Sequence, residues 1–352
     1  MCLSANNKEP PMSSPRPLEV YSYLTPTEHG PTLADVQRSV DEVAGLDRVL
    51  IGYHSFGPDG IVLGSTALTH SDQLNVLIAH RPGVVQPTVA ARELATMSLV
   101  SGGRVDVHVI NGGAPGDQYR EGDYLGHDDR YRRADEYVDL LRRTWTATEP
   151  WSHEGEFYKV EDVRPNEMHD PQIRVHMGGA SDAALTFGAA RADVYMLWGE
   201  PLAEVGQRIQ AIEEKAASFG RPRPRISLSL RLYVADTDEQ AWATAKADPA
   251  YQKYLAKGAG VTDRDHAQDA GRNRQLAVAR AGEEHDDCLW MGIVAALHGL
   301  GNAAALVGTE DRVMKTLAAY RELGVDTFLV AGDGGNWRPE LAPTVERMRR
   351  EL

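Results

Sequence analysis

The chain has 352 residues, of which 42% are hydrophobic and 25% are charged, and this composition excludes a largely disordered polypeptide. Lys and Arg total 37 against 51 Asp and Glu, and the resulting net charge of −14 disfavours binding to nucleic acid or to an anionic membrane surface. Two cysteines, Cys2 and Cys288, exclude a disulfide framework and a four-thiolate zinc site, and their scarcity favours a cytoplasmic protein.

Residues 1–17 are rich in Ser, Asn, Lys and Pro and are predicted to form a disordered leader. Residues 18–352 are predicted to form one domain in which short apolar runs alternate with helical patterns. Strands are expected at 18–24, 48–53, 73–80, 105–111, 174–178, 194–197, 226–234 and 327–331. Helices are expected at 33–42, 87–100, 130–145, 182–190, 202–219, 238–247, 311–323 and 339–352.

Eight strands alternating with helices predict an α/β protein with the (β/α)₈ TIM-barrel fold. A doubly wound open sheet is the main alternative, but the first strand lacks a Gly-x-Gly-x-x-Gly turn after it. Two connections are longer than plain βα units. Residues 112–172 include a predicted hairpin around Gly155, and residues 235–310 form a long insertion before the last strand. Its polar stretch, 248–287, is expected to act as a mobile, partly helical lid.

Active sites of such barrels form at the carboxyl ends of the strands, so the residues there are the candidates for chemistry. They include Thr25, His29, Tyr53, His54, His80, Arg81, Asn111, Gly112, Gly113, Gly178, Gly179, Trp198, Arg231, Tyr233, Gly332 and Asp333. This set contains no carboxylate pair for glycoside hydrolysis and no nucleophile elbow. It also contains no metal-binding signature, so no metal site is predicted.

Two features stand out among these candidates. The run Gly178-Gly179-Ala180-Ser181-Asp182 follows a strand and opens a helix, which suits either a phosphate-binding turn or a simple helix cap. Arg231 lies inside an apolar strand, where an unpaired charge is costly, so it must face a partner or a polar cavity. Asp333 is flanked by glycines and fits a turn better than an acid or base role.

The chain resembles the bacterial luciferase-like flavin monooxygenases, and within them most closely the alkanesulfonate monooxygenase branch. The resemblance rests on several runs in the expected order, namely residues 81–92, 101–104, 127–131, 178–182, 198–201, 231–234 and 305–308.

The resemblance implies a two-component monooxygenase that uses O₂ and reduced FMN supplied by a separate NAD(P)H-dependent flavin reductase. It implies a homodimer or homotetramer and a small organic substrate, sulfonate- or sulfone-like or another small metabolite. Gly179, Ala180 and Ser181 would then hold the FMN phosphate, Asn111 would contact the flavin ring and Tyr131 would lie on the flavin side of the mouth. Arg231 would face the flavin–oxygen adduct, and His29, His54 and Tyr233 would shape the substrate side.

The chain departs from the sulfonate branch at several substrate positions. Gly57 stands where those enzymes carry a cysteine, Tyr233 replaces a histidine, and residues 331–336 replace a Tyr-Pro-His cluster. No arginine matches the family's lid arginine near residues 297–301. Two alternatives therefore remain open, a deazaflavin-dependent oxidoreductase of the same superfamily and a non-catalytic flavin-binding protein.

Overall fold

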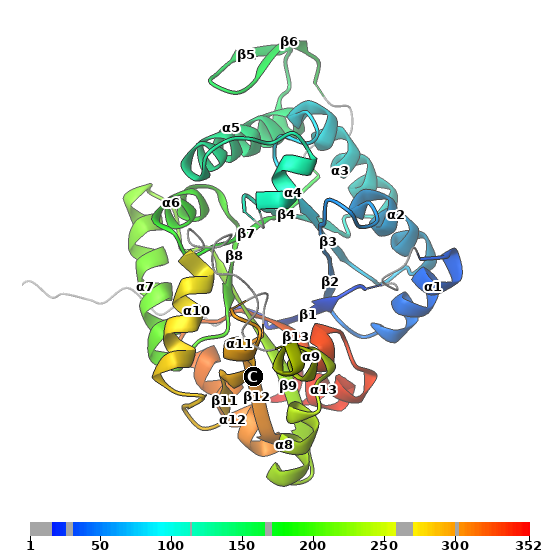
Figure 1. The fold of residues 1–352 in the computed structure, drawn as a ribbon. Helices are drawn as coiled ribbons and strands as arrows, with labels where there is room; N and C mark the ends of the chain where they lie inside the picture. Colours follow the sequence, from blue (N-terminus) through cyan, green and yellow to red (C-terminus); the bar gives the residue numbers. More distant parts are fainter. Residues whose placement is uncertain (1–15, 26–30, 113–114, 166–170, 258–269, 300–302) are drawn as a thin grey trace, which may run out of the picture.

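In the computed structural model, which describes residues 16–25, 31–112, 115–165, 171–257, 270–299 and 303–352, eight parallel strands close into a ring (Figure 1). Around the ring they follow the order β1 (Glu19–Tyr23), β2 (Arg48–Ile51), β3 (Val76–His80), β4 (Val105–Val109), β7 (Val175–Gly178), β8 (Val194–Trp198), β9 (Arg225–Ala235) and β13 (Thr327–Ala331). The ring closes because β9 pairs with β8 and β13, and β13 pairs with β1. The predicted (β/α)₈ barrel is confirmed.

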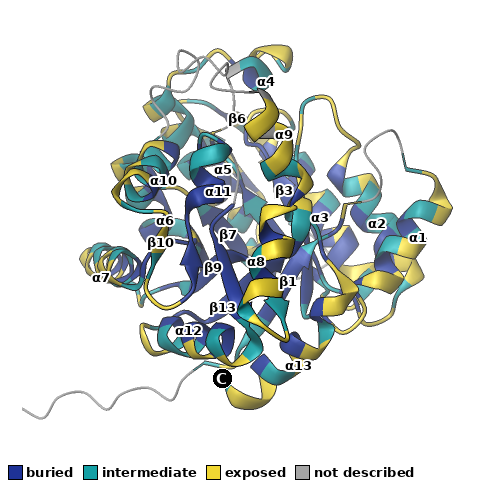
Figure 2. Cartoon of the chain, turned by 60° about the horizontal axis from the view of Figure 1, so that its bottom comes forward, coloured by how far each residue is buried: buried dark blue, intermediate teal, exposed yellow. Residues whose placement is uncertain are grey.

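Helices cover the outside of the ring and bury the apolar faces of the strands, which Figure 2 shows as a dark interior. They are α1 (Leu33–Glu42), α2 (Gly60–His70), α3 (Pro87–Ser101), α5 (His127–Thr146), α6 (Asp182–Arg191), α7 (Leu202–Ser218), α8 (Asp238–Lys246), α12 (Glu310–Glu322) and α13 (Ala342–Glu351). Most strands are continuous apolar runs such as Val76–His80, which is buried along its whole length. Such runs are typical of parallel strands covered on both faces.

Among the elements missing from the sequence-based prediction are helix α2 and strand β12 (Ala305–Thr309). Helix α2 was not predicted because its polar residues do not gather on one face, so its sequence carries no clear helical period. Strand β12 was not predicted as a strand; it pairs in parallel with the second half of β9, beyond the ring. Two short antiparallel strands, β10 (Glu284–His285) and β11 (Leu289–Trp290), extend the sheet from β12.

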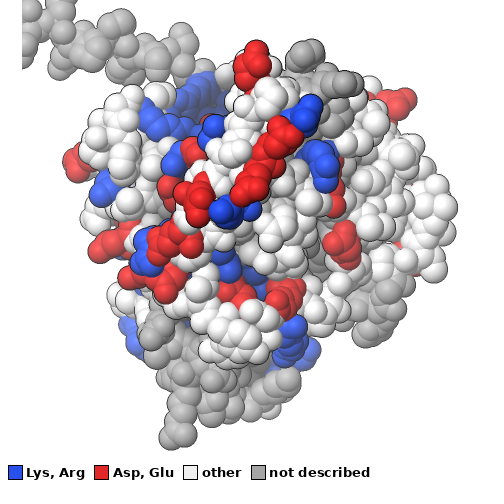
Figure 3. All heavy atoms as spheres, turned by 90° about the horizontal axis from the view of Figure 1, so that it is seen from above, with Lys and Arg blue, Asp and Glu red and all other residues white. Residues whose placement is uncertain are grey.

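The two long connections contain further elements. The first holds α4 (Pro115–Arg120) and an antiparallel hairpin of β5 (Trp151–Glu154) and β6 (Lys159–Val163), which confirms the hairpin around Gly155. Figure 3 looks at this side of the molecule, where acidic and basic side chains alternate. The second holds α9 (Pro249–Lys257), α10 (Ala270–Ala281) and α11 (Gly292–Ala296), three helices that we call the lid. In Figure 1 the lid lies over the part of the ring formed by β8, β9 and β13.

The amino-terminal end of the barrel is closed by a buried network of charges. The Asp106 carboxylate lies 3.2 Å from Arg48 Nε, 2.8 Å from Arg174 Nε and 3.0 Å from His176 Nε2. Burial raises the pKa of Asp106, but these partners outweigh it and hold the pKa well below its usual range. An apolar cluster lies above this network inside the barrel. Tyr21, Leu50, Leu77, Ala79 and Leu329 form a buried cluster, on which Tyr23, Tyr53 and Met196 pack.

A buried histidine predicts a pH dependence of stability. His80 at the end of β3 shares a 2.6 Å hydrogen bond with the Tyr137 hydroxyl, and burial lowers the pKa of His80 to about 4. An unfolded chain takes up a proton at this ring near pH 6.5, whereas the folded chain does so only near pH 4, so the folded state loses stability as pH falls through this window. We expect about 1.4 kcal/mol per pH unit from this group. The free energy of unfolding is to be measured with urea between pH 4.5 and 7. Its increase with pH should be smaller by this amount in His80→Gln than in the wild type, and an equal increase would contradict the assignment.

Candidate active site

A turn of two glycines joins β7 to α6 and forms the first part of the site. Gly179 has a φ of 151°, and a Cβ there would lie only 2.6 Å from the Cβ of Ala184. The Gly179 carbonyl accepts hydrogen bonds from the Tyr195 hydroxyl at 2.8 Å and from Arg208 at 3.0 Å. Ser181 caps α6 by accepting from the Ala184 N–H, which leaves its own hydroxyl proton free to donate. A glycine turn at a helix N-terminus is suited to an anion.

Two residues of α5, Arg130 and Tyr131, connect the end of β4 to this turn. Arg130 donates to the Asn111 carbonyl at 2.8 Å, and the neighbouring Tyr131 places its hydroxyl 3.1 Å from where a Gly179 Cβ would stand. The parallel register of β4 and β7 pairs Val109 with Met177, so that Asn111 and Gly179, each two residues further, are level with each other. The structure therefore brings Asn111, Tyr131 and Gly179 together.

The Asn111 side chain is buried, yet within the part of the chain that the structure describes neither its Oδ1 nor its Nδ2 has a hydrogen-bond partner. Buried amides are almost always paired, because an unpaired one costs about 1–3 kcal/mol. A buried amide with a free donor and a free acceptor at the carboxyl end of a barrel strand is suited to a ligand that offers both groups.

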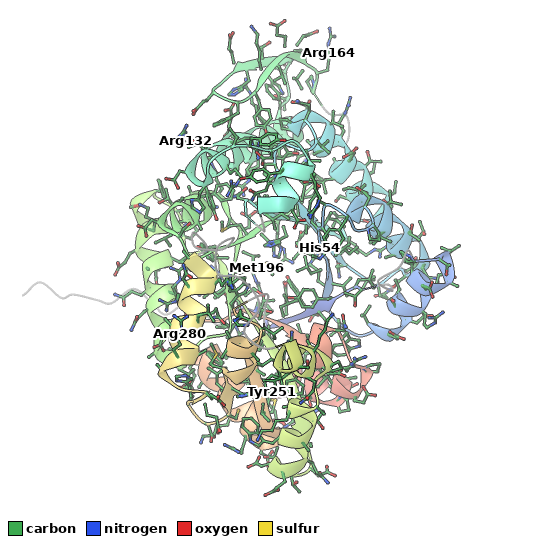
Figure 4. The ribbon with its side chains drawn as sticks, in the orientation of Figure 1. His54, Arg132, Arg164, Met196, Tyr251 and Arg280 are labelled. Atoms are coloured by element: carbon green, nitrogen blue, oxygen red, sulfur yellow. The ribbon has the colours of Figure 1, made fainter. Side chains whose placement is uncertain are left out.

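The ends of β2 and β3 form the opposite side of the mouth. Tyr53 donates to the Glu121 carboxylate, and Arg81 bonds the same carboxylate at 2.6 Å while lying 4.8 Å from the centre of the Tyr53 ring. Burial and the bond to Glu121 raise the pKa of Tyr53, so this phenol stays protonated. The predicted site residue His54 is exposed and stacks on Phe56. Figure 4 shows His54 and Met196 toward the middle of the ring.

Arg231 and Tyr233 meet at one buried carboxylate, that of Asp248. Arg231 Nη1 lies 3.2 Å from Asp248 Oδ2, and the Tyr233 hydroxyl donates to the same oxygen at 2.6 Å. The N–H of Gly334, after β13, also donates to it at 2.6 Å, and the other oxygen accepts from the Tyr251 N–H as the cap of α9. Burial raises the pKa of Asp248, but the bonds and the charge of Arg231 outweigh it and lower the pKa. Asp248 thus ties the lid to the barrel.

The sequence did not single out Asp248 as a site residue. A signal for it exists, since Asp248 directly precedes Pro249 and so fits a helix cap, while the buried Arg231 requires a carboxylate partner. Glu121 was not predicted as a site residue either. The signal for it is similar, since the buried Arg81 also requires a carboxylate partner.

The lid also touches the end of β8. Arg274 on α10 bonds both oxygens of Glu200 at 2.7 Å, and Gln275 donates to the Gly199 carbonyl at 2.9 Å. Trp198, at the end of the same strand, is 37% exposed and follows the inward-facing Met196 by two residues. Figure 4 shows Tyr251 and Arg280 on the lid helices, at the edge of the ring.

The remaining candidates are placed as follows. His29 and Gly113 lie outside the described residues. Asp333 lies in a short turn and pairs with Arg338, an arrangement that favours the turn role over an acid or base role. Among the residues that the structure describes, no cluster of side chains could hold a metal ion, and none of the described helices is long and apolar enough to cross a bilayer.

Comparison with known proteins agrees with this fold. EDTA monooxygenase from Chelativorans sp. BNC1 superposes with a TM-score of 0.73 at 16% identity, covering 96% of this chain and 93% of that one. DmoA from Hyphomicrobium sulfonivorans superposes with a TM-score of 0.71 at 18% identity, covering 96% of this chain and 86% of that one. An F420-dependent secondary alcohol dehydrogenase superposes with a TM-score of 0.65 at 13% identity, covering 96% of this chain and 98% of that one. The profile of the family described as luciferase-like monooxygenase matches residues 22–327. The chain therefore belongs to the luciferase-like monooxygenase family.

Proposed function

We propose that this protein is a two-component monooxygenase that uses reduced FMN and O₂ to oxygenate a small organic substrate. The observation that carries the proposal is the buried, unpaired amide of Asn111 level with the glycine turn at Gly179. A flavin offers both parts of such a site a partner, because its phosphate suits the turn and its ring carries donors and acceptors for an amide. Family membership and the fold shared with EDTA monooxygenase support the same reading.

Each residue of the site has a physical task in this proposal. The backbone of Gly179 and Ala180 and the Ser181 hydroxyl hold the phosphate, with the Tyr131 hydroxyl beside them. Bound reduced FMN would supply two electrons to O₂, so that one oxygen atom reaches the substrate and the other leaves as water. Arg231 stabilises negative charge that develops near the substrate.

On the substrate side, Asp248 fixes the guanidinium of Arg231 and the hydroxyl of Tyr233. His54, which follows β2, borders the substrate. His29 is proposed to shape the same substrate side. The lid excludes water from the mouth.

The proposal includes its surroundings. We place the protein in the cytoplasm as a homodimer or homotetramer that receives reduced FMN from an NAD(P)H-dependent reductase. The second candidate is a deazaflavin-dependent oxidoreductase, which the fold shared with the F420-dependent alcohol dehydrogenase keeps open. A deazaflavin also carries phosphate, so the glycine turn suits both cofactors.

Anaerobic titration with reduced FMN, oxidised FMN and a reduced deazaflavin tests the assignment. Saturable binding of reduced FMN, tighter than of the deazaflavin, is expected. The opposite order would establish the second candidate, and the absence of binding by all three would refute both.

Replacing Asn111 with leucine separates binding from folding. The change removes an unpaired buried amide, so we expect the free energy of unfolding without flavin to rise by about 1 kcal/mol. Affinity for reduced FMN should fall about tenfold or more, because the ring loses its polar partner. In the control Asn75→Leu, which removes a bond to the Asp47 carbonyl at the other end of the barrel, stability should fall and affinity should stay. An Asn111→Leu protein that binds reduced FMN as tightly as the wild type would refute this role.

A further inference from the structure

The arginines around the mouth divide into two groups by their partners. At the ends of β3, β8, β9 and β13, four arginines are paired with carboxylates: Arg81 with Glu121, Arg274 with Glu200, Arg231 with Asp248, and Arg338 with Asp333. Next to the glycine turn the pattern is different. Arg130 bonds the carbonyls of Asn111 and Leu125, and Arg208 bonds the carbonyl of Gly179.

This division gives the two sides of the mouth different charges. A carbonyl leaves the charge of an arginine intact, whereas a carboxylate in contact cancels it. The side of Gly179 therefore carries positive charge that an anionic phosphate can use. On the other side, the guanidinium groups of Arg81, Arg274 and Arg231 each lie within 3.2 Å of a carboxylate, and the carboxylate of Asp248 is fully buried. An anionic substrate beside these three arginines would lose its hydration without gaining an unpaired cation.

The side chains between these ion pairs are largely apolar or aromatic. Tyr23 and Met196 pack on the apolar cluster inside the barrel, and Tyr53 joins them under Arg81. Trp198 stands two residues above Met196, on the same face of β8, and is partly exposed. Aromatic faces such as these bind rings by stacking and add little for a small ion.

We propose that the substrate side of this site accepts an uncharged, ring-bearing organic compound and selects against sulfonates, with Asp248 as the positioning residue that cancels the charge of Arg231. This inference rests on the proposed function, because it concerns the substrate of the same site. It departs from the sulfonate substrate that resemblance alone suggests.

A matched pair of probes isolates charge from shape. Benzenesulfonate and methyl phenyl sulfone share a phenyl ring and a sulfur with oxygens, but only the first is an anion. Both are titrated by calorimetry into the wild-type protein, alone and with saturating reduced FMN under anaerobic conditions. We expect the sulfone to bind at least about tenfold more tightly than the sulfonate, since an unmatched charge in a partly buried site costs more than that ratio.

Asp248→Asn should reverse the preference. Asparagine keeps the oxygen that accepts from the Tyr251 N–H at the start of α9, whereas its amide nitrogen no longer accepts from Arg231, Tyr233 and Gly334, so Arg231 regains a net positive charge. Affinity for benzenesulfonate should rise about tenfold or more and affinity for the sulfone should change less than threefold. Glu121→Gln frees Arg81 in the same way without touching the lid, and carries the test if Asp248→Asn fails to fold. The control is Asp238→Asn, which removes the charge of Asp238 from its ion pair with Arg312 between α8 and α12 and should change neither affinity.

Three results would overturn the inference. The first is a wild-type protein that binds the sulfonate as well as the sulfone. The second is an unchanged preference in both folded variants, Asp248→Asn and Glu121→Gln. The third is the absence of binding by either probe in every protein. Failure of the proposed function is visible separately, because it appears as the absence of reduced-FMN binding while the preference between the two probes can still be measured on the protein alone.

Discussion

Replacing Arg231 with methionine is expected to lower turnover by about 10²–10³-fold and the free energy of unfolding by about 3–5 kcal/mol. The loss of stability follows because the Asp248 carboxylate, which has no exposed surface, would keep its charge without a matching cation. The loss of turnover follows because methionine has no N–H groups, so the hydrogen bonds that the Arg231 guanidinium can donate to negative charge developing at the substrate would be lost even though its net charge is already balanced by Asp248. Urea unfolding and steady-state oxygenation measure the two effects.

A double variant separates the two effects. Arg231→Met together with Asp248→Asn removes both charges, so we expect most of the lost stability to return while turnover stays low. The control Arg225→Met removes a cation from the opposite end of β9, where Arg225 bonds the Pro17 carbonyl, and should cost stability without changing turnover per folded molecule. If turnover in Arg231→Met stays within a few-fold of the wild type, Arg231 has no catalytic role.

Replacing Gly179 with valine is expected to weaken reduced-FMN binding by about 100-fold or more. A branched side chain would strain the backbone at a φ of 151° and would overlap the Cβ of Ala184, which stands at the first turn of α6. The turn and the helix would have to move apart, which would displace both the proposed phosphate site and the neighbouring Tyr131 hydroxyl. Anaerobic titration of the purified variant with reduced FMN measures the change.

Gly220 offers a matched control for this variant. It has a φ of 68° at the end of α7, and nothing lies within 4 Å of a Cβ placed there. Valine at Gly220 therefore introduces backbone strain without a collision and away from the mouth. It should lower stability and leave flavin affinity unchanged. Equal losses of affinity in the two variants would show that the effect of Gly179→Val is a general loss of structure.

The barrel itself could be predicted from the sequence because its signals are local. Apolar runs such as 76–80 and 327–331 fit buried parallel strands, and the helices between most of them carry a polar face. Helix α2 was not predicted because its polar and apolar residues do not separate onto two faces, which leaves no helical period to detect. Strand β12 escaped because its pairing with the upper half of β9 is a long-range contact, formed where β9 rises above the ring.

The meeting of Asn111 with the glycine turn could be predicted from the sequence, whereas the carboxylate partners of Arg231 and Arg81 could not. The glycine turn and Asn111 lie at the ends of neighbouring strands, and the order of strands in a barrel follows from the chain. The partners of Arg231 and Arg81 come from insertions, whose path no periodicity describes. Asp248 begins the lid and Glu121 follows α4, so both ion pairs appear only once the insertions are folded against the mouth.

The measurement that tests the central claim most directly is stopped-flow mixing of the protein, loaded anaerobically with reduced FMN, with oxygenated buffer. We expect the visible spectrum to pass through a transient species that decays more slowly than any species formed with free reduced FMN, because the site excludes water around the bound flavin. Oxidation at the rate and with the spectra of free reduced FMN would contradict the assignment of this protein as an FMN-dependent monooxygenase.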